Sequence, residues 1–258
     1  MITAIISRKG GVGKTTTAVN LAAALAERDR RVLLVDLDSQ ASSSLSLGVP
    51  PDQLSPSSAD LLLHTARADE IIRPTSIANL RLITASVDLM DADAQLGNYR
   101  GRHLRLRSVL QPVADTYDDI FLDCPSGLAV VPANAVVAAH TFLLPTTPQF
   151  LSTTGLRNMI AAAERMSWDA GGRIQPLGLL LTMVDYRTKL TRRLVDQIRT
   201  DYGSLVFAIE VRINTRLAEA PEEGRSIFQH DPHAKGAQAY RLLAEEFLIR
   251  CREVGRRG

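Results

Sequence analysis

The sequence predicts an α/β fold in which a doubly wound, mostly parallel sheet carries helices on both faces. Two observations support this prediction. Short apolar runs alternate along the chain with stretches of helical spacing, as they do in βαβ units. The apolar run at residues 177–184 is continuous, which is typical of a strand covered on both sides. Ligands bind such sheets at the carboxyl ends of the strands, so we expect the functional residues there.

Each element follows from its local pattern. Apolar runs predict strands at residues 2–6, 32–35, 80–84, 120–123, 141–144, 177–184 and 205–209. Apolar residues spaced three and four apart predict helices at 17–27, 59–63, 87–96, 103–114, 153–166, 189–200 and 235–253. Prolines at 50, 51 and 56 predict a loop over residues 42–58. We expect Met159 and Ala163 to face the core, and likewise Tyr240, Leu243 and Phe247 in the last helix.

Composition limits the possible functions. The chain has 258 residues, 45% of them hydrophobic, which is enough for one domain over residues 1–258. Its formal net charge is only +2, so a basic site for nucleic acid must be local. Cys124 and Cys251 are the two cysteines and do not form a disulfide framework, which favours a reducing cytosol. No signal peptide is visible and no apolar run approaches the roughly 20 residues of a transmembrane helix, so no membrane association is expected.

A glycine-rich loop between the first strand and the first helix is the strongest motif. The order strand, glycine loop, helix is that of a phosphate-binding P-loop. Its backbone N–H groups and the positive end of the helix bind phosphate oxygens, while Lys14 neutralises charge and the Thr15 hydroxyl ligates Mg²⁺. Arg8 stands where the usual pattern has a glycine, and Lys9 is an additional lysine. We assign nucleotide binding to Lys9, Gly10, Gly11, Val12, Gly13, Lys14, Thr15 and Thr16.

Aspartates follow two of the predicted strands. Asp36 and Asp38 come after the strand at 32–35, and Asp123 ends the strand at 120–123 in the manner of a Walker B motif. Carboxylates at this edge can hold Mg²⁺ through water or orient an attacking water molecule. The alternative for Asp36 and Asp38 is that they only cap the next helix. We assign metal binding to Thr15, Asp38 and Asp123.

The P-loop resembles the deviant Walker A motif of the ParA/MinD ATPases, whose extra lysine is matched by Lys9. The resemblance implies that Lys9 reaches the nucleotide of a second subunit in an ATP-dependent homodimer, while Lys14 acts within its own subunit. It also implies a hydrolytic role for Asp38, with Asp36 supporting it. Lys9, Lys14 and Asp38 are therefore the expected catalytic residues. Two details depart from the family pattern. Ser39 replaces a proline, and Asp123-Cys124-Pro125-Ser126-Gly127 replaces Asp-x-Pro-Pro, with a tail nearer to MinD.

The carboxyl-terminal third resembles Soj-type ParA proteins. Residues 214–221 read Asn-Thr-Arg-Leu-Ala-Glu-Ala-Pro, and Gly224, Asp231-Pro232 and Gly-Ala-Gln-Ala-Tyr at 236–240 complete the pattern. The resemblance places Asn214 near the adenine. Arg212-Ile213 stands in place of the family Pro-Arg, which leaves the details of base recognition open.

The same resemblance implies nonspecific binding of double-stranded DNA through a basic cluster, by phosphate neutralisation without base contacts. Arg199 is a further candidate for this face, and the alternative is a solvated helix surface. The expected DNA-binding residues are Arg187, Lys189, Arg192, Arg193 and Arg216.

The resemblance to ParA and Soj implies a chromosome- or plasmid-partition ATPase that uses ATP and Mg²⁺, has slow intrinsic turnover and is stimulated by a ParB-like centromere-binding protein. We expect it to be cytoplasmic and nucleoid-associated. Because the chain begins at the first strand, we expect no amino-terminal helix-turn-helix domain. The main alternative is a MinD-like membrane-associated positioning ATPase. A metal-cluster ATPase is disfavoured because the cysteines do not form a Cys-x-x-Cys pair. The sequence identifies neither the cargo, the partner nor the hydrolysis rate.

Overall fold

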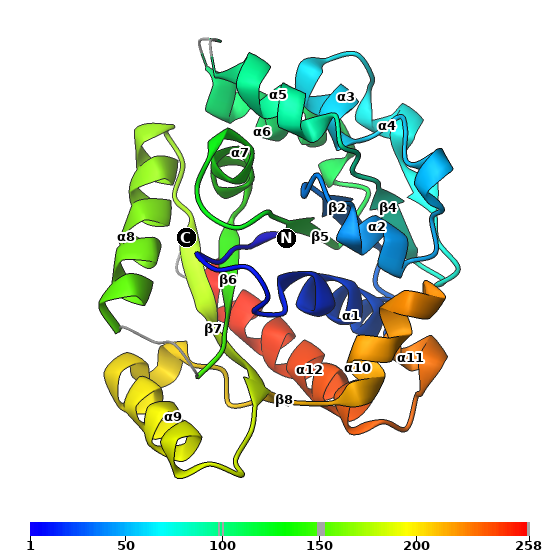
Figure 1. Ribbon diagram of the computed structural model, residues 1–258. Helices are drawn as coiled ribbons and strands as arrows, with labels where there is room; N and C mark the ends of the chain where they lie inside the picture. The colour runs from blue at the N-terminus through cyan, green and yellow to red at the C-terminus, as the bar shows by residue number, and fades with distance from the viewer. Residues whose placement is uncertain (98, 100, 149–152, 257–258) are drawn as a thin grey trace.

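A mixed but mostly parallel sheet forms the centre of the computed structural model, which describes residues 1–97, 99, 101–148 and 153–256 (Figure 1). The strand order in the described residues is β3-β4-β2-β5-β1-β6-β7-β8, and every pairing is parallel except that of β3 with β4. This confirms the predicted fold class. The strands are β1 (Ile2–Ile5), β2 (Val32–Asp36), β3 (Arg73–Pro74), β4 (Leu80–Ile83), β5 (Asp119–Asp123), β6 (Thr141–Thr146), β7 (Gln175–Val184) and β8 (Val211–Arg212).

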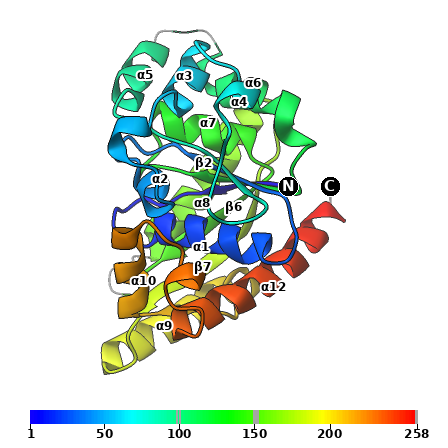
Figure 2. The same cartoon turned by 90° about the vertical axis from the view of Figure 1, so that its right-hand side faces the viewer.

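Helices cover both faces of this sheet. One layer contains α1 with α10, α11 and α12, and the other contains α3 to α9 (Figures 1 and 2). The helices are α1 (Lys14–Ala26), α2 (Ser42–Ser46), α3 (Ser58–Leu63), α4 (Ala68–Ile71), α5 (Leu89–Leu96), α6 (Arg105–Ala114), α7 (Val130–Ala138), α8 (Thr153–Asp169), α9 (Lys189–Tyr202), α10 (Thr215–Glu219), α11 (Ile227–His230) and α12 (Lys235–Gly255). Four 3₁₀ turns lie in the described residues, at η1 (Pro51–Gln53), η2 (Arg102–Leu104), η3 (Gly203–Leu205) and η4 (Ala220–Glu223).

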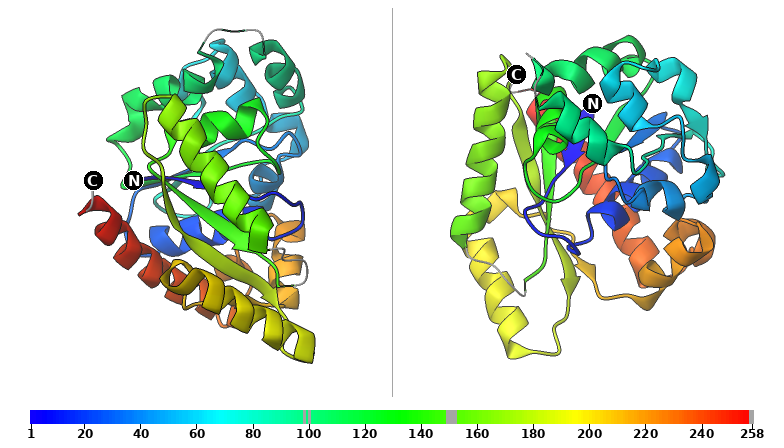
Figure 3. Two further views of the ribbon diagram at one scale, coloured as in Figure 1. Left: turned by 90° about the vertical axis from the view of Figure 1, so that its left-hand side faces the viewer. Right: turned by 45° about the horizontal axis from the view of Figure 1, so that its top comes forward.

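The predicted apolar faces of two helices are buried as expected. On α12, Tyr240, Leu243 and Phe247 are 1%, 0% and 0% exposed. Phe247 stacks at a tilt on Phe121 of β5, with ring centroids 5.3 Å apart. On the other face, Met159 and Ala163 of α8 are buried against β6 and β7, along which the helix lies in Figure 3. Burial of these side chains supplies much of the free energy that docks the helices, because apolar area leaves water.

The strand predicted at residues 205–209 does not form. Val206 makes one isolated bridge to Leu179, and the strand that pairs with β7 comes later, at β8. The N–H of Phe207 still donates to the carbonyl of Leu179 at 2.9 Å, but side chains take the backbone hydrogen bonds that would continue the ladder. The Glu246 carboxylate accepts from the N–H groups of residues 208 and 209 at 2.8 and 3.0 Å, and Arg250 donates to the carbonyl of Val206 at 2.8 Å. Phe207 is buried beneath the Arg250 guanidinium. The apolar side chains of residues 205–209 therefore pack in the core although the segment is not a strand.

The prediction of a loop over residues 42–58 is wrong in part, because α2 and η1 lie within it. The short helix α2 is held by partners that are distant in sequence. Ser44 donates to the Asp36 carboxylate through both its backbone N–H and its hydroxyl, and Ser43 donates to Asp123. Helix α7 was not predicted, because it is apolar nearly all around and lacks a helical period; it is buried between neighbouring elements. The short elements α4, β3, α10 and α11 were also not predicted.

Candidate nucleotide-binding site

The P-loop leaves β1 and enters α1 in a conformation that glycine permits. Gly11 and Gly13 have φ angles of 72° and 81°, in the left-handed region that residues with a Cβ disfavour. The Thr182 hydroxyl of β7 donates to the carbonyl of Val12 at 2.9 Å and anchors the loop from a strand two positions away from β1 in the sheet. Helix α1 begins at Lys14, so Lys14, Thr15 and Thr16 form its first turn. The free N–H groups of this turn therefore face an anion at the loop.

A cavity of about 580 Å³ opens in front of this loop at the carboxyl ends of the strands. It brings most of the predicted nucleotide-binding residues together with Asp38, whereas Lys9 and Val12 are not among the described residues that line it. Asn20 of α1, Met183 of β7 and the segment around Pro221 also line the cavity. The sequence analysis missed these residues, because their distance from the P-loop in the chain hides their position. The predicted residues along its wall are Gly10, Gly11, Gly13, Lys14, Thr15, Thr16 and Asp38.

Asp36 and Asp123 end neighbouring strands and stand in register across the sheet. Both are fully buried, and burial raises the pKa of each carboxyl group. The Ser43 hydroxyl donates to one oxygen of Asp123 at 2.7 Å, while the other oxygen is buried without a hydrogen-bond partner. Ser43, Thr15 and Lys14 act against this shift in the pKa of Asp123. An unpaired buried oxygen is costly, and a hydrated cation beside it would remove that cost.

The residues at this position fit Mg²⁺. The described chain contains no cluster of three or more acidic, histidine or cysteine side chains that could cage a metal by itself. Mg²⁺ is characteristically held by one or two carboxylates together with substrate phosphates and water. Asp123, with its unpaired oxygen, and the Thr15 hydroxyl are the groups that would hold it here, and Asp36 would support Asp123 from the adjacent strand.

Asp38 lies just beyond the end of β2 and is partly exposed to the cavity. Its backbone N–H donates to Asp36 at 3.2 Å, and its own carboxylate accepts from the N–H of Gln40 at 3.1 Å. Asp36 is therefore a buried support that shapes the turn, and Asp38 is the carboxylate that lines the cavity. Asp36 accepts from the N–H of Ser44 in the first turn of α2 at 2.9 Å, so the capping alternative holds in part for Asp36. The side chain of Asp38 bonds to Gln40 instead, and the N-cap residue of α2 is Ala41.

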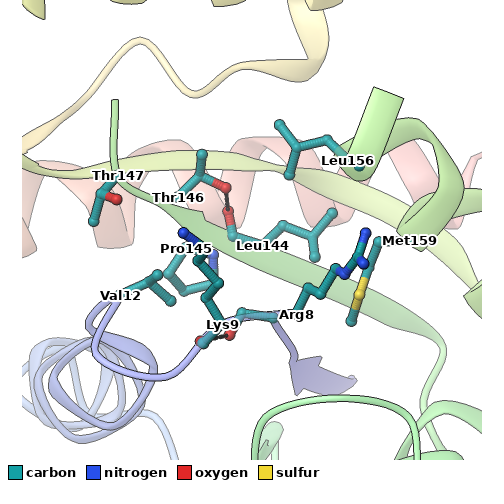
Figure 4. A pocket seen from close by; sticks show the side chains of 11 residues that line it. Arg8, Lys9, Val12, Leu144, Pro145, Thr146, Thr147, Leu156 and Met159 are labelled. Carbon is teal, nitrogen blue, oxygen red and sulfur yellow. Dashed lines mark hydrogen bonds between the residues drawn. The ribbon is translucent and has the colours of Figure 1, made fainter. Parts of the chain in front are cut away.

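Lys9 and Arg8 line a second cavity, of about 360 Å³, between the P-loop, β6 and α8. Figure 4 shows the Arg8 side chain extending toward Met159 and that of Lys9 extending toward Pro145. Lys9 is exposed, and its carbonyl accepts from the Ser7 hydroxyl at 2.6 Å. The two P-loop lysines thus face different cavities, because Lys14 is 7% exposed and lines the nucleotide cavity.

The predicted DNA-binding residues follow two adjacent strand ends, since β7 and β8 pair near Val184 and Arg212. Lys189, Arg192 and Arg193 are exposed at the start of α9. Arg187 is 84% exposed and pairs with Asp185 at 2.6 Å.

Arg216 on α10 pairs with Glu219 at 2.8 Å and lies 3.7 Å from Asp231. Arg199 does not share the exposed face of α9. Its guanidinium lies 3.5 Å from Glu210 and donates to the carbonyls of Phe207 and Ala208. Asn214 is the N-cap of α10, where its side-chain oxygen accepts from the N–H of Leu217 at 3.3 Å. It is not among the described residues that line the nucleotide cavity.

Comparisons with known proteins find relatives that cover nearly the whole chain. A protein-family model described as an AAA domain matches residues 1–171. The chain is 36% identical over 249 residues to the chromosome partitioning protein ParA of Myxococcus xanthus, covering 96% of this chain and 88% of the relative. It is 35% identical over 245 residues to the sporulation initiation inhibitor protein Soj of Bacillus subtilis, covering 95% of this chain and 97% of that protein.

Solved structures show the same fold. A cobyrinic acid a,c-diamide synthase from Mycobacterium smegmatis, crystallised with an ATP analogue and magnesium, superposes with a TM-score of 0.79 at 31% identity, covering 95% of this chain and 92% of that one. The cell division ATPase MinD of Pyrococcus furiosus superposes with a TM-score of 0.76 at 29% identity, covering 96% and 98%. The family model that matches residues 1–171 and the near full-length relatives lead to one conclusion: this chain belongs to the ParA/Soj type of the ParA/MinD family of P-loop ATPases.

Proposed function

We propose that residues 1–258 form one ATPase domain that partitions DNA, dimerising around bound ATP, holding DNA nonspecifically and releasing it after hydrolysis. One observation carries the proposal. The first turn of α1, Lys14, Asp38 and the unpaired oxygen of Asp123 meet at one edge of the sheet. A phosphate cradle, a cation, a carboxylate facing the cavity and a place for Mg²⁺ are the parts that phosphoryl transfer to water requires.

The chemistry assigns a role to each group. Bound Mg²⁺ neutralises charge on the phosphates of ATP. Lys14 neutralises the charge that develops on the transferred phosphoryl group, and the N–H groups of the first turn of α1 bind its oxygens. Asp38, held by Asp36 and Gln40, orients the attacking water. A slow intrinsic turnover fits this arrangement, because Lys9 faces the second cavity and leaves the nucleotide site of a single copy without its second lysine.

The position of Lys9 supports the homodimer. An exposed lysine at the entrance of the P-loop can place its ammonium on a triphosphate bound by a facing copy. ATP would then join two copies, because each contributes a cation to the phosphates held by the other. ADP lacks the terminal phosphoryl group, so it binds one copy without supporting the pair.

The basic residues that follow β7 and β8 support DNA binding. The side chains of Arg187 and Arg216 are 84% and 54% exposed, and their carboxylate partners Asp185 and Glu219 are 19% and 46% exposed. Ion pairs whose guanidinium stays open to water contribute little to stability. DNA phosphates can therefore replace these partners, and Lys189, Arg192 and Arg193 add charge next to them. Dimerisation doubles this surface, which makes DNA affinity depend on ATP. As in the family, a ParB-like partner would stimulate hydrolysis, and the ATP-bound dimer would be nucleoid-associated.

A MinD-like membrane ATPase is the second candidate, favoured by the structural likeness to MinD. In that function, the last helix would offer its apolar face to lipid. Here Tyr240, Leu243 and Phe247 are buried against the rest of the chain, so the apolar face of α12 packs in the core and is not available to lipid. Across the residues that the structure describes, no helix combines the length and the apolar character needed to cross a bilayer.

DNA retention and vesicle flotation, each measured with ATP, with ADP and without nucleotide, test the proposal. Retention of a duplex of arbitrary sequence should require ATP and weaken steeply as salt rises, because binding releases counterions from the DNA. Vesicles of anionic phospholipid should not carry the protein to the top of a gradient under the same conditions. Flotation with ATP and no DNA retention would establish the membrane function in its place.

A further inference from the structure

The hydroxyl of Ser126 occupies a position in the nucleotide cavity to which no role has been assigned above. Ser126 lies in the loop between β5 and α7 and lines the cavity together with Gly10 and Lys14. Its oxygen accepts a hydrogen bond from the Lys14 ammonium at 2.9 Å. The lysine that serves the phosphates is thus held by a side chain from another strand end.

Backbone hydrogen bonds set the position of Ser126. The N–H of Cys124 donates to the carbonyl of Ile5 at 3.3 Å, and the N–H of Gly127 donates to that of Ser7 at 3.0 Å. Gly127 has a φ of 93°, a left-handed conformation that turns the chain just after Ser126. The loop is therefore tied to the end of β1 on both sides of Ser126, at the point where the P-loop begins.

The hydroxyl also lies close to the start of the P-loop. A Cβ built on Gly10 would stand 3.7 Å from the Ser126 oxygen. A side chain at position 10 would thus touch Ser126, whose hydroxyl is within hydrogen-bond range of Lys14 at the other end of the glycine loop. In the ATP site proposed above, the ammonium of Lys14 binds the phosphates. A hydroxyl 2.9 Å from that ammonium therefore lies within reach of the terminal phosphoryl group.

We propose that Ser126 binds the γ-phosphate of ATP: its hydroxyl, which accepts from Lys14 here, donates to the terminal phosphoryl group once Lys14 has turned to the phosphates. The exchange is balanced in hydrogen bonds. Lys14 gives up a hydroxyl oxygen and gains phosphate oxygens. The Ser126 hydroxyl, whose proton is not needed in its bond with the ammonium, donates that proton to a phosphate oxygen. Because ADP lacks that acceptor, Ser126 favours ATP over ADP. The proposal rests on the ATP site proposed above and adds to it a residue that distinguishes the two nucleotides.

Binding constants for ATP and ADP measured with Ser126→Ala test this role. We expect the ratio of ATP to ADP affinity to fall by about tenfold, because a hydrogen bond from a hydroxyl to a charged oxygen is lost only in the ATP complex. Ser126→Thr, which keeps a hydroxyl, should restore the ratio. Ser204→Ala, the same change at an exposed serine outside the cavity, should leave it unchanged. Calorimetry with ADP and a non-hydrolysable ATP analogue at low protein concentration measures the ratio without DNA.

The possible outcomes distinguish a failure of the Ser126 proposal from a failure of the proposed ATP site. If Ser126→Ala changes the affinity for both nucleotides by the same factor, Ser126 only holds Lys14 and the γ-phosphate role is wrong. An unchanged ratio with intact binding overturns it as well, while the ATP site stands. If the wild-type chain binds neither nucleotide, the proposed function fails and this inference fails with it. A thermal melt of each variant shows that the fold is kept, which the exposed position of Ser126 favours.

Discussion

Adjacent leucines on α12 allow a direct test of whether the apolar face of this helix belongs to the core or to a membrane. Leu243 is 0% exposed and Leu242 is 49% exposed, so the same substitution at neighbouring positions separates burial from chemistry. Leu243→Ala removes buried methyl groups between α12 and the sheet and leaves a cavity. Such changes destabilise proteins by about 2–5 kcal/mol. Leu242→Ala should change the free energy of unfolding by no more than about 0.5 kcal/mol.

Urea unfolding followed by circular dichroism measures both variants without nucleotide at one protein concentration. With a slope of about 3 kcal/mol per molar urea, a loss of about 3 kcal/mol lowers the midpoint by about 1 M. This is a large part of the 5–15 kcal/mol that stabilises a typical domain. Equal midpoints for the two variants would show that Leu243 is not part of the core. If Leu243→Ala kept its stability and instead abolished vesicle flotation, α12 would be a membrane anchor.

Four further predictions follow from the site and its surroundings. Lys9→Ala should bind ATP normally but stay monomeric in light scattering, because the second cation is missing; an ATP-dependent dimer would contradict the role of Lys9. Asp38→Ala should lower turnover by at least about 100-fold, since the attacking water loses its orienting carboxylate, and the ATP dimer should remain on DNA; unchanged phosphate release would exclude that role. Arg216→Glu should abolish DNA retention in gel shifts while dimerisation persists, because phosphates meet a negative charge, and wild-type shifts would move the DNA surface elsewhere. Burial and nearby positive charge lower the pKa of His140 in the folded chain. Its Nδ1 accepts a hydrogen bond from the N–H of Ile2 at 2.9 Å. The unfolded chain therefore binds a proton at His140 more readily than the folded chain does. The contribution of His140 to the free energy of unfolding is therefore present above its usual pKa of about 6.5 and is lost as pH falls below that value. A urea midpoint that stays constant as pH is lowered from neutral to mildly acidic would refute this prediction.

Departures from the predicted elements have a common physical cause. The apolar run at residues 205–209 has strand-like composition, but Glu246 and Arg250 of α12 bond its backbone and prevent a ladder from forming. Conversely, α2 forms in a segment of loop-like composition because Asp36 and Asp123 accept hydrogen bonds from Ser44 and Ser43. In both places, tertiary hydrogen bonds outweigh local propensity, which is a weak preference for each residue.

The sequence by itself determined the fold class, the phosphate loop and the strand ends that carry Asp38 and Asp123. These depend on residues that are contiguous in the chain: a phosphate cradle needs closely spaced glycines before a helix, and an apolar strand that ends in aspartate delivers its carboxylate to a known edge. The tertiary structure alone decided which side chains complete the site. Ser126 meets Lys14, and Ser43 meets Asp123, across separations of 112 and 80 residues. Such pairs form only when the sheet brings its strand ends together, so no local sequence pattern predicts them.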